Sequence, residues 1–164
     1  MSWKCDICGV EHDELPTCFG MEAPWRALVA ESEFGERVEL TADQCVVDGK
    51  KFFVRGHVEI PIHGHAEPLA FSVWASLSEK SFRTMTERWE AGDRAMDAPY
   101  FGWLCSPIAV YGNTIHLKLS VQSRAPGLTP MFTVEPGEHP LAVDQQNGIS
   151  MARWHELAHR ILQG

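Results

Sequence analysis

The amino-acid sequence predicts an α+β domain: an antiparallel β-sheet with about three helices, mainly on one face, and an N-terminal Cys/His metal knuckle. Strand-like segments with alternating polar and apolar residues are joined by short turn signals, and only a few amphipathic segments interrupt them. Three cysteines and a histidine lie within the first 18 residues. A chain of 164 residues suits one hydrophobic core, so we expect a single domain, 1–164, with a metal-binding segment, 1–20, and an α+β body, 21–164.

The N-terminal segment has the spacing of a metal site. Two residues separate Cys5 from Cys8, which lets a tight turn direct both sulfurs at one ion, and His12 follows closely. Structural zinc needs four ligands, and the fourth is either the nearby Cys18 or the distant Cys45. We prefer Cys45, because a distant ligand would fasten the N-terminal segment to the body. A thiol redox pair is the weaker alternative, since no predicted strand precedes Cys5.

The predicted strands follow in the body of the chain. Asp48-Gly49 is a strong hairpin signal between CVV and KFFVRGHVEI. In PLAFSVWASL, residues 68–77, every second residue is apolar and points to one face. Three further strands are expected in YFGWLCSPI, TIHLKLSVQS and MFTVE.

Three helices are expected. One runs from about Ala23 to Phe34, and the second begins after Ser78, a good N-cap, and ends near Ala91. The third follows Ser150 and has a continuous apolar face. Because these few helices interrupt hairpin-linked strands, the sheet is expected to be antiparallel.

The last predicted helix carries the sequence HELAH, which matches a zinc-peptidase motif. His155 and His159 lie one turn apart, and Glu156 is the residue type that activates a water molecule. The apolar face of the helix, however, leaves Glu156 and His159 toward solvent, and only five residues remain for a downstream third ligand. A solvated helix surface is therefore favoured over a peptidase site.

The second face of the sheet carries aromatic and charged side chains. Strand parity places Trp74 opposite the core, and it does the same for Phe53, Arg55, His57, Glu59, His116 and Lys118. Such a face is able to hold a small anionic or planar ligand. A plain solvated face, which is normal for an antiparallel sheet, is the favoured interpretation.

Composition excludes two classes of partner. The sequence has 14 Lys and Arg against 22 Asp and Glu, a net charge of -8, so we expect no nucleic-acid partner. No apolar run approaches the roughly 20 residues that cross a bilayer, and the first residues lack a signal-peptide pattern, so we expect no membrane partner. Five cysteines without an export signal indicate a reducing compartment, and we predict a cytoplasmic protein.

Several segments together resemble a bacterial family known as domain of unknown function 2199. These segments are CDICG with His12, DQCVVDGKKFFVRGHVEIP, VWASLSEKSF, PYFGWL and HPLAVDQQNGI. The resemblance covers nearly the whole chain and implies a small single-domain bacterial protein without an established activity. It also implies that Cys5, Cys8, His12 and Cys45 are the matched Cys, Cys, His and Cys positions, whereas Cys18 and HELAH are particular to this chain.

The sequence thus predicts a domain with a structural zinc site that binds a protein or a small molecule. The alternative is a zinc-dependent hydrolase that uses His155, Glu156 and His159. A closed four-ligand site predicts that chelation unfolds the protein, whereas an open site predicts lost activity with an intact fold. The sequence does not determine the ligand, the oligomeric state or whether the protein is an enzyme.

Overall fold

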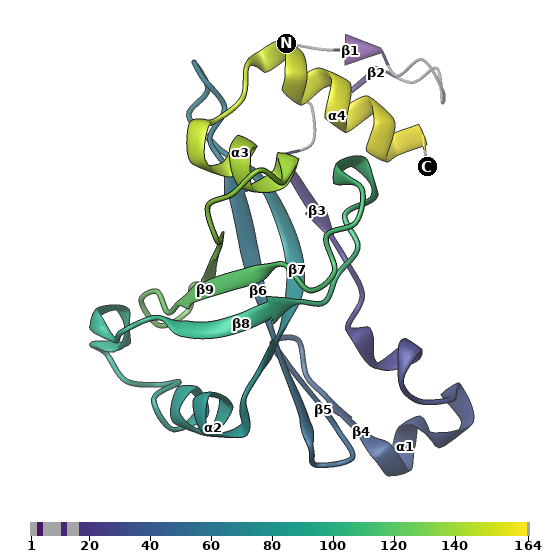
Figure 1. The fold of residues 1–164 in the computed structure, drawn as a ribbon, viewed down its shortest axis with the longest axis vertical. Helices are drawn as coiled ribbons and strands as arrows, with labels where there is room; N and C mark the ends of the chain where they lie inside the picture. The colour runs from purple at the N-terminus through teal and green to yellow at the C-terminus, as the bar shows by residue number, and fades with distance from the viewer. Residues whose placement is uncertain (1–2, 5–10, 13–16, 164) are drawn as a thin grey trace.

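The computed structural model describes residues 3–4, 11–12 and 17–163 (Figure 1). The strands are β1 Trp3–Lys4, β2 Glu11–His12, β3 Cys18–Gly20, β4 Val38–Leu40, β5 Gln44–Val47, β6 Lys51–Ile60, β7 Leu69–Leu77, β8 Tyr100–Leu104, β9 Lys118–Gln122 and β10 Met131–Val134. The α-helices are α1 Phe34–Arg37, α2 Glu79–Glu87, α3 Pro140–Asn147 and α4 Met151–Gln163. Short 3-10 helices are η1 Pro24–Ala27, η2 Glu31–Glu33, η3 Arg94–Met96 and η4 Ala109–Tyr111.

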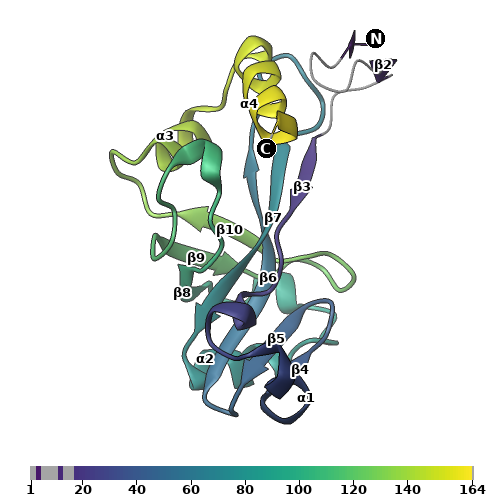
Figure 2. The ribbon, with the colours of Figure 1, turned by 90° about the vertical axis from the view of Figure 1, so that its right-hand side faces the viewer.

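Five strands close into a barrel. The order β6-β7-β8-β9-β10 returns to β6, because β6 pairs with β7 along one edge and with β10 along the other. Strand β5 pairs with the first half of β6, and β4 pairs with β5. Strand β3 pairs with β7, as β8 does farther along the same strand. The two long strands β6 and β7 therefore belong both to the barrel and to the sheet that extends beyond it (Figures 1 and 2).

The predicted antiparallel sheet with helices on one face is wrong. Five strands that alternate in direction leave the first and the last pointing the same way, so closure requires a parallel pair, here β10 with β6. The pairing of β3 with β7 is parallel as well. A closed barrel leaves its two ends to be covered, and the helices lie at those ends: α2 at one, and α3 and α4 at the other (Figure 1).

The predicted N-terminal metal knuckle is not part of the observed fold either. Cys5 and Cys8, on which the prediction depends, lie outside the described residues. Within the described part of the chain, no group of three or more His, Cys, Asp or Glu side chains is arranged to hold a metal ion.

Alternating residues of the barrel strands form the main core. Inward-facing side chains that are completely buried include Val54, Val58, Leu69, Phe71, Val73, Leu104, Val121 and Phe132. Gly56 also faces inward on β6, and the ring of Phe132 from β10 occupies the space beside it. A side chain at position 56 would overlap that ring, so this glycine makes room for the aromatic residue that fills the barrel.

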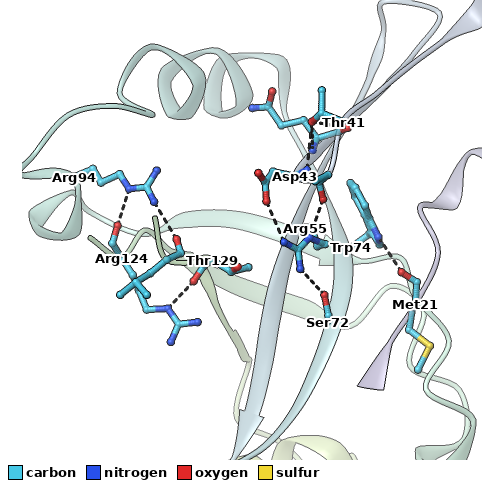
Figure 3. A network of polar contacts seen from close by, with 12 residues as sticks. Met21, Thr41, Asp43, Arg55, Ser72, Trp74, Arg94, Arg124 and Thr129 are labelled. Carbon is cyan, nitrogen blue, oxygen red and sulfur yellow. Dashed lines mark hydrogen bonds and ion pairs between the residues drawn. The ribbon is translucent and has the colours of Figure 1, made fainter. Parts of the chain in front are cut away.

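A second apolar cluster lies outside the barrel. It consists of Trp25, Val29, Val38, Cys45, Val47, Phe53 and Trp74. Trp74 points away from the barrel interior, as its strand parity predicts, and its indole Nε1 donates a hydrogen bond to the carbonyl oxygen of Met21 at 3.2 Å (Figure 3). Residues 20–47 thus cover the outer face of β6 and β7, which the sequence alone left open to solvent.

The helix predicted from Ala23 to Phe34 is replaced by shorter elements. The structure has η1, η2 and the single turn of α1, and none of the three has a side-chain hydrogen bond at its N-cap. An uncapped helix of this length has little stability of its own, so tertiary packing determines the backbone. Burial of Trp25 and Val29 in the outer cluster accounts for the broken path.

Two other helices begin where the sequence predicts. Ser78 Oγ accepts a hydrogen bond from the Ser81 amide at 3.1 Å, and Ser150 Oγ accepts one from the Arg153 amide at 3.1 Å. Helix α3 was not predicted; its N-cap is a histidine, His139, whose ring nitrogen accepts from the Leu141 amide at 3.1 Å. None of the described helices is long and apolar enough to cross a membrane.

A polar cluster joins α3, α4 and η4. The Tyr111 hydroxyl donates a hydrogen bond to Asp144 Oδ2 at 2.7 Å, and Arg153 Nε donates to the same oxygen at 2.8 Å. Burial of Tyr111, together with its bond to Asp144, raises the pKa of the phenol, so the hydroxyl remains a donor at neutral pH. The carboxylate of Asp144 is only 14% exposed, which makes it a shared acceptor within the fold.

Candidate functional site

The predicted metal ligands are only partly described. Cys5 and Cys8 lie outside the described residues, and His12 is placed by its backbone in β2, paired with Trp3 of β1. Cys18 begins β3 and is exposed, whereas Cys45 in β5 is fully buried. The zinc site with Cys5, Cys8, His12 and Cys45 therefore stays a prediction.

Cys18 and Cys45, the two candidates for the fourth ligand, lie at different ends of the long strands. Cys18 is beside Ala70 of β7, while Cys45 pairs with Phe53, which in turn pairs with Ser76 of β7. The stretch of β7 from Ala70 to Ser76 corresponds to a rise of ~20 Å. Figure 1 shows β4 and β5 at the opposite end of the molecule from β1 and β2.

The surroundings of Cys45 also oppose metal binding at that thiol. Burial raises the pKa of Cys45 to about 11, because an apolar environment disfavours the thiolate. Zinc binds the thiolate form, so a cysteine in the outer apolar cluster must lose its proton where charge is least stable. Cys18, in contrast, is exposed and belongs to the same N-terminal segment, 1–20, as the other three predicted ligands.

Within the HELAH motif of α4, the three polar residues are less buried than the two apolar ones. Trp154, Leu157 and Ala158 are buried, and Glu156 is exposed. His155 and His159 are half-buried, and the ring of His155 lies 5.3 Å from that of Trp154. The described residues supply no third ligand that would complete a metal group with this pair. The hydrolase alternative stays a prediction.

The outer face of β6 carries a polar strip. Arg55, His57 and Glu59 point away from the barrel interior and are half-buried. Glu59 forms an ion pair with Arg124 at 2.7 Å. Burial, followed by the positive charges of Arg124 and Arg55, lowers the pKa of His57, so this imidazole is neutral at neutral pH.

An apolar hollow, which we call the aromatic pocket, opens on the outer face near the start of β6. Its volume is about 630 Å³, within the usual range for small-molecule sites. The lining residues are Pro24, Ala27, Leu28, Lys51, Phe52, Phe53, Ser76, Trp103, Cys105, Ile115 and His116. Trp103 and Ile115 are 39% and 42% exposed, so apolar surface is presented to incoming molecules.

The polar groups of the aromatic pocket indicate binding more than catalysis. Burial raises the pKa of the Cys105 thiol, so it is protonated at neutral pH and is a poor nucleophile. Lys51 and His116 are exposed. The Lys118 ammonium lies 5.9 Å from the centre of the Trp103 ring and adds a further cation to this side.

Part of this pocket is predictable from the sequence. Strand parity placed Phe53 and His116 on the outer face, but nothing indicated that Pro24 and Leu28 would cross over it. His116 also adopts a positive φ of 73°, and β9 begins only at Lys118, not at residue 114 as the alternating pattern predicted. The turn carries Ile115 to the pocket instead of the barrel core.

A comparison with models of protein families identifies the family of this chain. The sequence profile of "Uncharacterized protein conserved in bacteria (DUF2199)" matches residues 4–149. The chain belongs to this family. The predicted resemblance is confirmed, and the matched region includes every residue of the aromatic pocket, whereas the HELAH segment of α4 lies beyond it. Among curated proteins and among solved structures, none matches the chain.

Proposed function

We propose that this member of the DUF2199 family binds a small molecule with a flat apolar part and a negative charge in the aromatic pocket. The observation that carries the proposal is an apolar hollow of about 630 Å³ that already exists in the protein. A preformed cavity lined by aromatic side chains with a few polar groups is the usual form of a small-molecule site. We expect the protein to act in the cytoplasm.

The two parts of the ligand follow from the lining. Phe53 and Trp103 offer aromatic surfaces against which a planar group gains both apolar burial and ring contacts. Lys51 provides a cation for an acidic substituent, in a protein whose overall charge is -8. A protein partner is the less favoured alternative, because the apolar surface is concave.

Binding of an aromatic sulfonate tests this proposal. 8-Anilinonaphthalene-1-sulfonate should bind the folded protein at one saturable site with an increase in dye fluorescence. Trp103→Ala removes the exposed aromatic wall, and a ring–ring contact energy of about 0.5 to 1.5 kcal/mol, added to the lost apolar burial, gives a Kd roughly fivefold weaker or more. Fluorescence titration of both proteins gives the comparison.

Met96→Ala is the matched control for the dye experiment. Met96 is 86% exposed and is not part of the pocket, so its removal takes away a similar apolar side chain elsewhere. Its Kd should equal that of the unaltered protein. Equal affinities of the Trp103→Ala and unaltered proteins for the dye would contradict the proposed site.

A structural zinc site is the second part of the proposal. Cys5, Cys8 and His12 are the expected ligands, and the exposed thiol of Cys18 now supports it as the fourth in place of Cys45. A tetrahedral site of three thiolates and one imidazole would be closed, with no position for substrate. Such an ion would stabilise the protein and would take no part in a reaction.

The zinc content of cysteine variants distinguishes the two candidates for the fourth ligand. Protein purified without chelator should contain one equivalent of zinc, and removal of zinc should lower the midpoint of thermal unfolding. Cys18→Ser should reduce the zinc content by more than half, whereas Cys45→Ser should retain it. Full zinc content in Cys18→Ser together with loss in Cys45→Ser would overturn the revised choice, and protein without zinc would remove the site altogether.

A further inference from the structure

A smaller polar cavity lies on another part of the outer surface. It has a volume of about 240 Å³. Its lining residues are Asp43, Arg55, Trp89, Arg94, Gly127, Leu128 and Thr129. They come from the turn before β5, from β6, from the segment after α2, and from the loop between β9 and β10. Figure 3 shows Arg55 and Arg94 reaching toward this region from different elements, with Thr129 between them.

Arg94 contributes a buried positive charge to this cavity. Its side chain is buried, and its guanidinium donates to the carbonyl oxygens of Trp89, Arg124, Ala125 and Leu128 at 2.7 to 3.1 Å. These acceptors are neutral, and no ion pair in the described part of the chain includes Arg94. Carbonyl groups take four of its five N–H donors and leave one N–H on Nη1, and they do not provide a counterion for its charge.

Arg55 is held in a fixed orientation at the same cavity. Its Nε donates to the Ala42 carbonyl oxygen at 2.8 Å, Nη1 to Ser72 Oγ at 2.9 Å and Nη2 to Asp43 Oδ1 at 3.2 Å (Figure 3). Each terminal nitrogen carries two hydrogens and makes one of these bonds among the described residues. A second N–H on each nitrogen is therefore available to a ligand.

The local charge balance is positive although the protein is acidic. The charged residues that line the cavity are Arg55, Arg94 and Asp43, so the lining has one positive charge in excess. Outside the lining, Arg124 is paired with Glu59, Arg88 is paired with both Asp93 and Asp97, and His57 is neutral. An anion in this space would compensate a buried guanidinium and meet donors that are already oriented, so little ordering is needed on binding.

We propose that this cavity is a binding site for a small oxyanion, a carboxylate or a phosphate group, held between Arg55 and Arg94. The open N–H groups on the two terminal nitrogens of Arg55, together with the remaining Nη1 N–H of Arg94, can donate charge-assisted hydrogen bonds to the oxygens of either anion. Thr129 also lines the cavity, and the ring of Trp89, 4.9 Å from the Arg94 guanidinium, helps to hold that charge in place. This site is separate from the aromatic pocket and does not depend on it.

Thermal unfolding in the presence of defined anions tests the proposal. Phosphate, malonate and chloride are compared at equal ionic strength, so that general screening is the same in each. At tenfold over Kd, phosphate or malonate should raise the midpoint by about 3 to 6 °C relative to chloride. A response to phosphate alone assigns a phosphate group, and one to malonate alone assigns a carboxylate. No difference among the three would overturn the proposal.

Arg55→Gln tests the location of the anion. Loss of this guanidinium should weaken the effective anion at least tenfold in calorimetric titration, and Ser72→Ala, a milder change that frees one end of Arg55, should weaken it severalfold. Arg83→Gln is the charge-matched control, because Arg83 lies on the exposed side of α2 in an ion pair with Glu79. If Arg55→Gln unfolds, the Ser72→Ala titration decides. Binding unchanged by Ser72→Ala and by any folded Arg55→Gln protein would contradict the site.

Discussion

Gly56→Ala should lower the free energy of unfolding by about 3 kcal/mol, at the upper end of the range for an overpacked core. The added Cβ would overlap three atoms of the Phe132 ring, and Phe132 is completely buried inside the closed barrel. Gly56 does not have a positive φ, so the cost arises from crowding and not from an unfavourable backbone. Urea-induced unfolding measures the change.

Two further variants test whether the loss of stability in Gly56→Ala comes from the contact with Phe132. Gly35→Ala is the matched control: no atom lies within 4 Å of its added Cβ, and it should leave stability unchanged or slightly raised. Combining Gly56→Ala with Phe132→Leu should cost less than the sum of the two single changes, because a smaller side chain accommodates the new methyl group. Strict additivity would mean that Phe132 does not fill the space beside Gly56.

Asp144→Ala should lower the free energy of unfolding by about 3 kcal/mol. The change removes the acceptor of both Tyr111 and Arg153 and leaves a buried hydroxyl without a partner. Tyr111 is 4% exposed, so most of the loss is expected there, whereas Arg153 is 38% exposed and can be hydrated. For a chain of this size the unfolding midpoint should fall by about 6 to 12 °C.

Asp144→Asn separates the hydrogen bond from the charge. Asparagine keeps an oxygen that accepts from Tyr111 but loses the attraction to Arg153, so it should recover more than half of the stability. Glu79→Ala, which breaks the exposed pair with Arg83, should have little effect. A loss in Asp144→Ala as small as that in Glu79→Ala would show that the cluster does not hold α4 against the barrel.

Local patterns were predictable where one face of an element is buried. The alternation in β7 and the capping residues Ser78 and Ser150 depend on neighbours in sequence, and the structure has each of them. Barrel closure was not predictable in the same way, because it depends on the pairing of β10 with β6, strands more than 70 residues apart. The alternation of polar and apolar residues is the same in an open sheet and in a closed one.

The features of the candidate sites were also predictable only in part. Strand parity correctly put Arg55 and Trp74 on the outer face, but it could not show that residues 20–47 fold over this face and bury Trp74. Cys45 stays a predicted metal ligand, and its burial in the outer cluster, which its residue type does not reveal, follows from that long-range packing. The sites depend on contacts between segments that are far apart in the sequence, and the spacing of residues within one segment does not predict such contacts.

A crystal structure of the protein soaked with 8-anilinonaphthalene-1-sulfonate tests the proposed function most directly. We expect ordered dye in the aromatic pocket, with its rings against Trp103 and Phe53 and its sulfonate directed toward Lys51 or His116. Ordered dye at another surface, with the aromatic pocket occupied only by water, would contradict it.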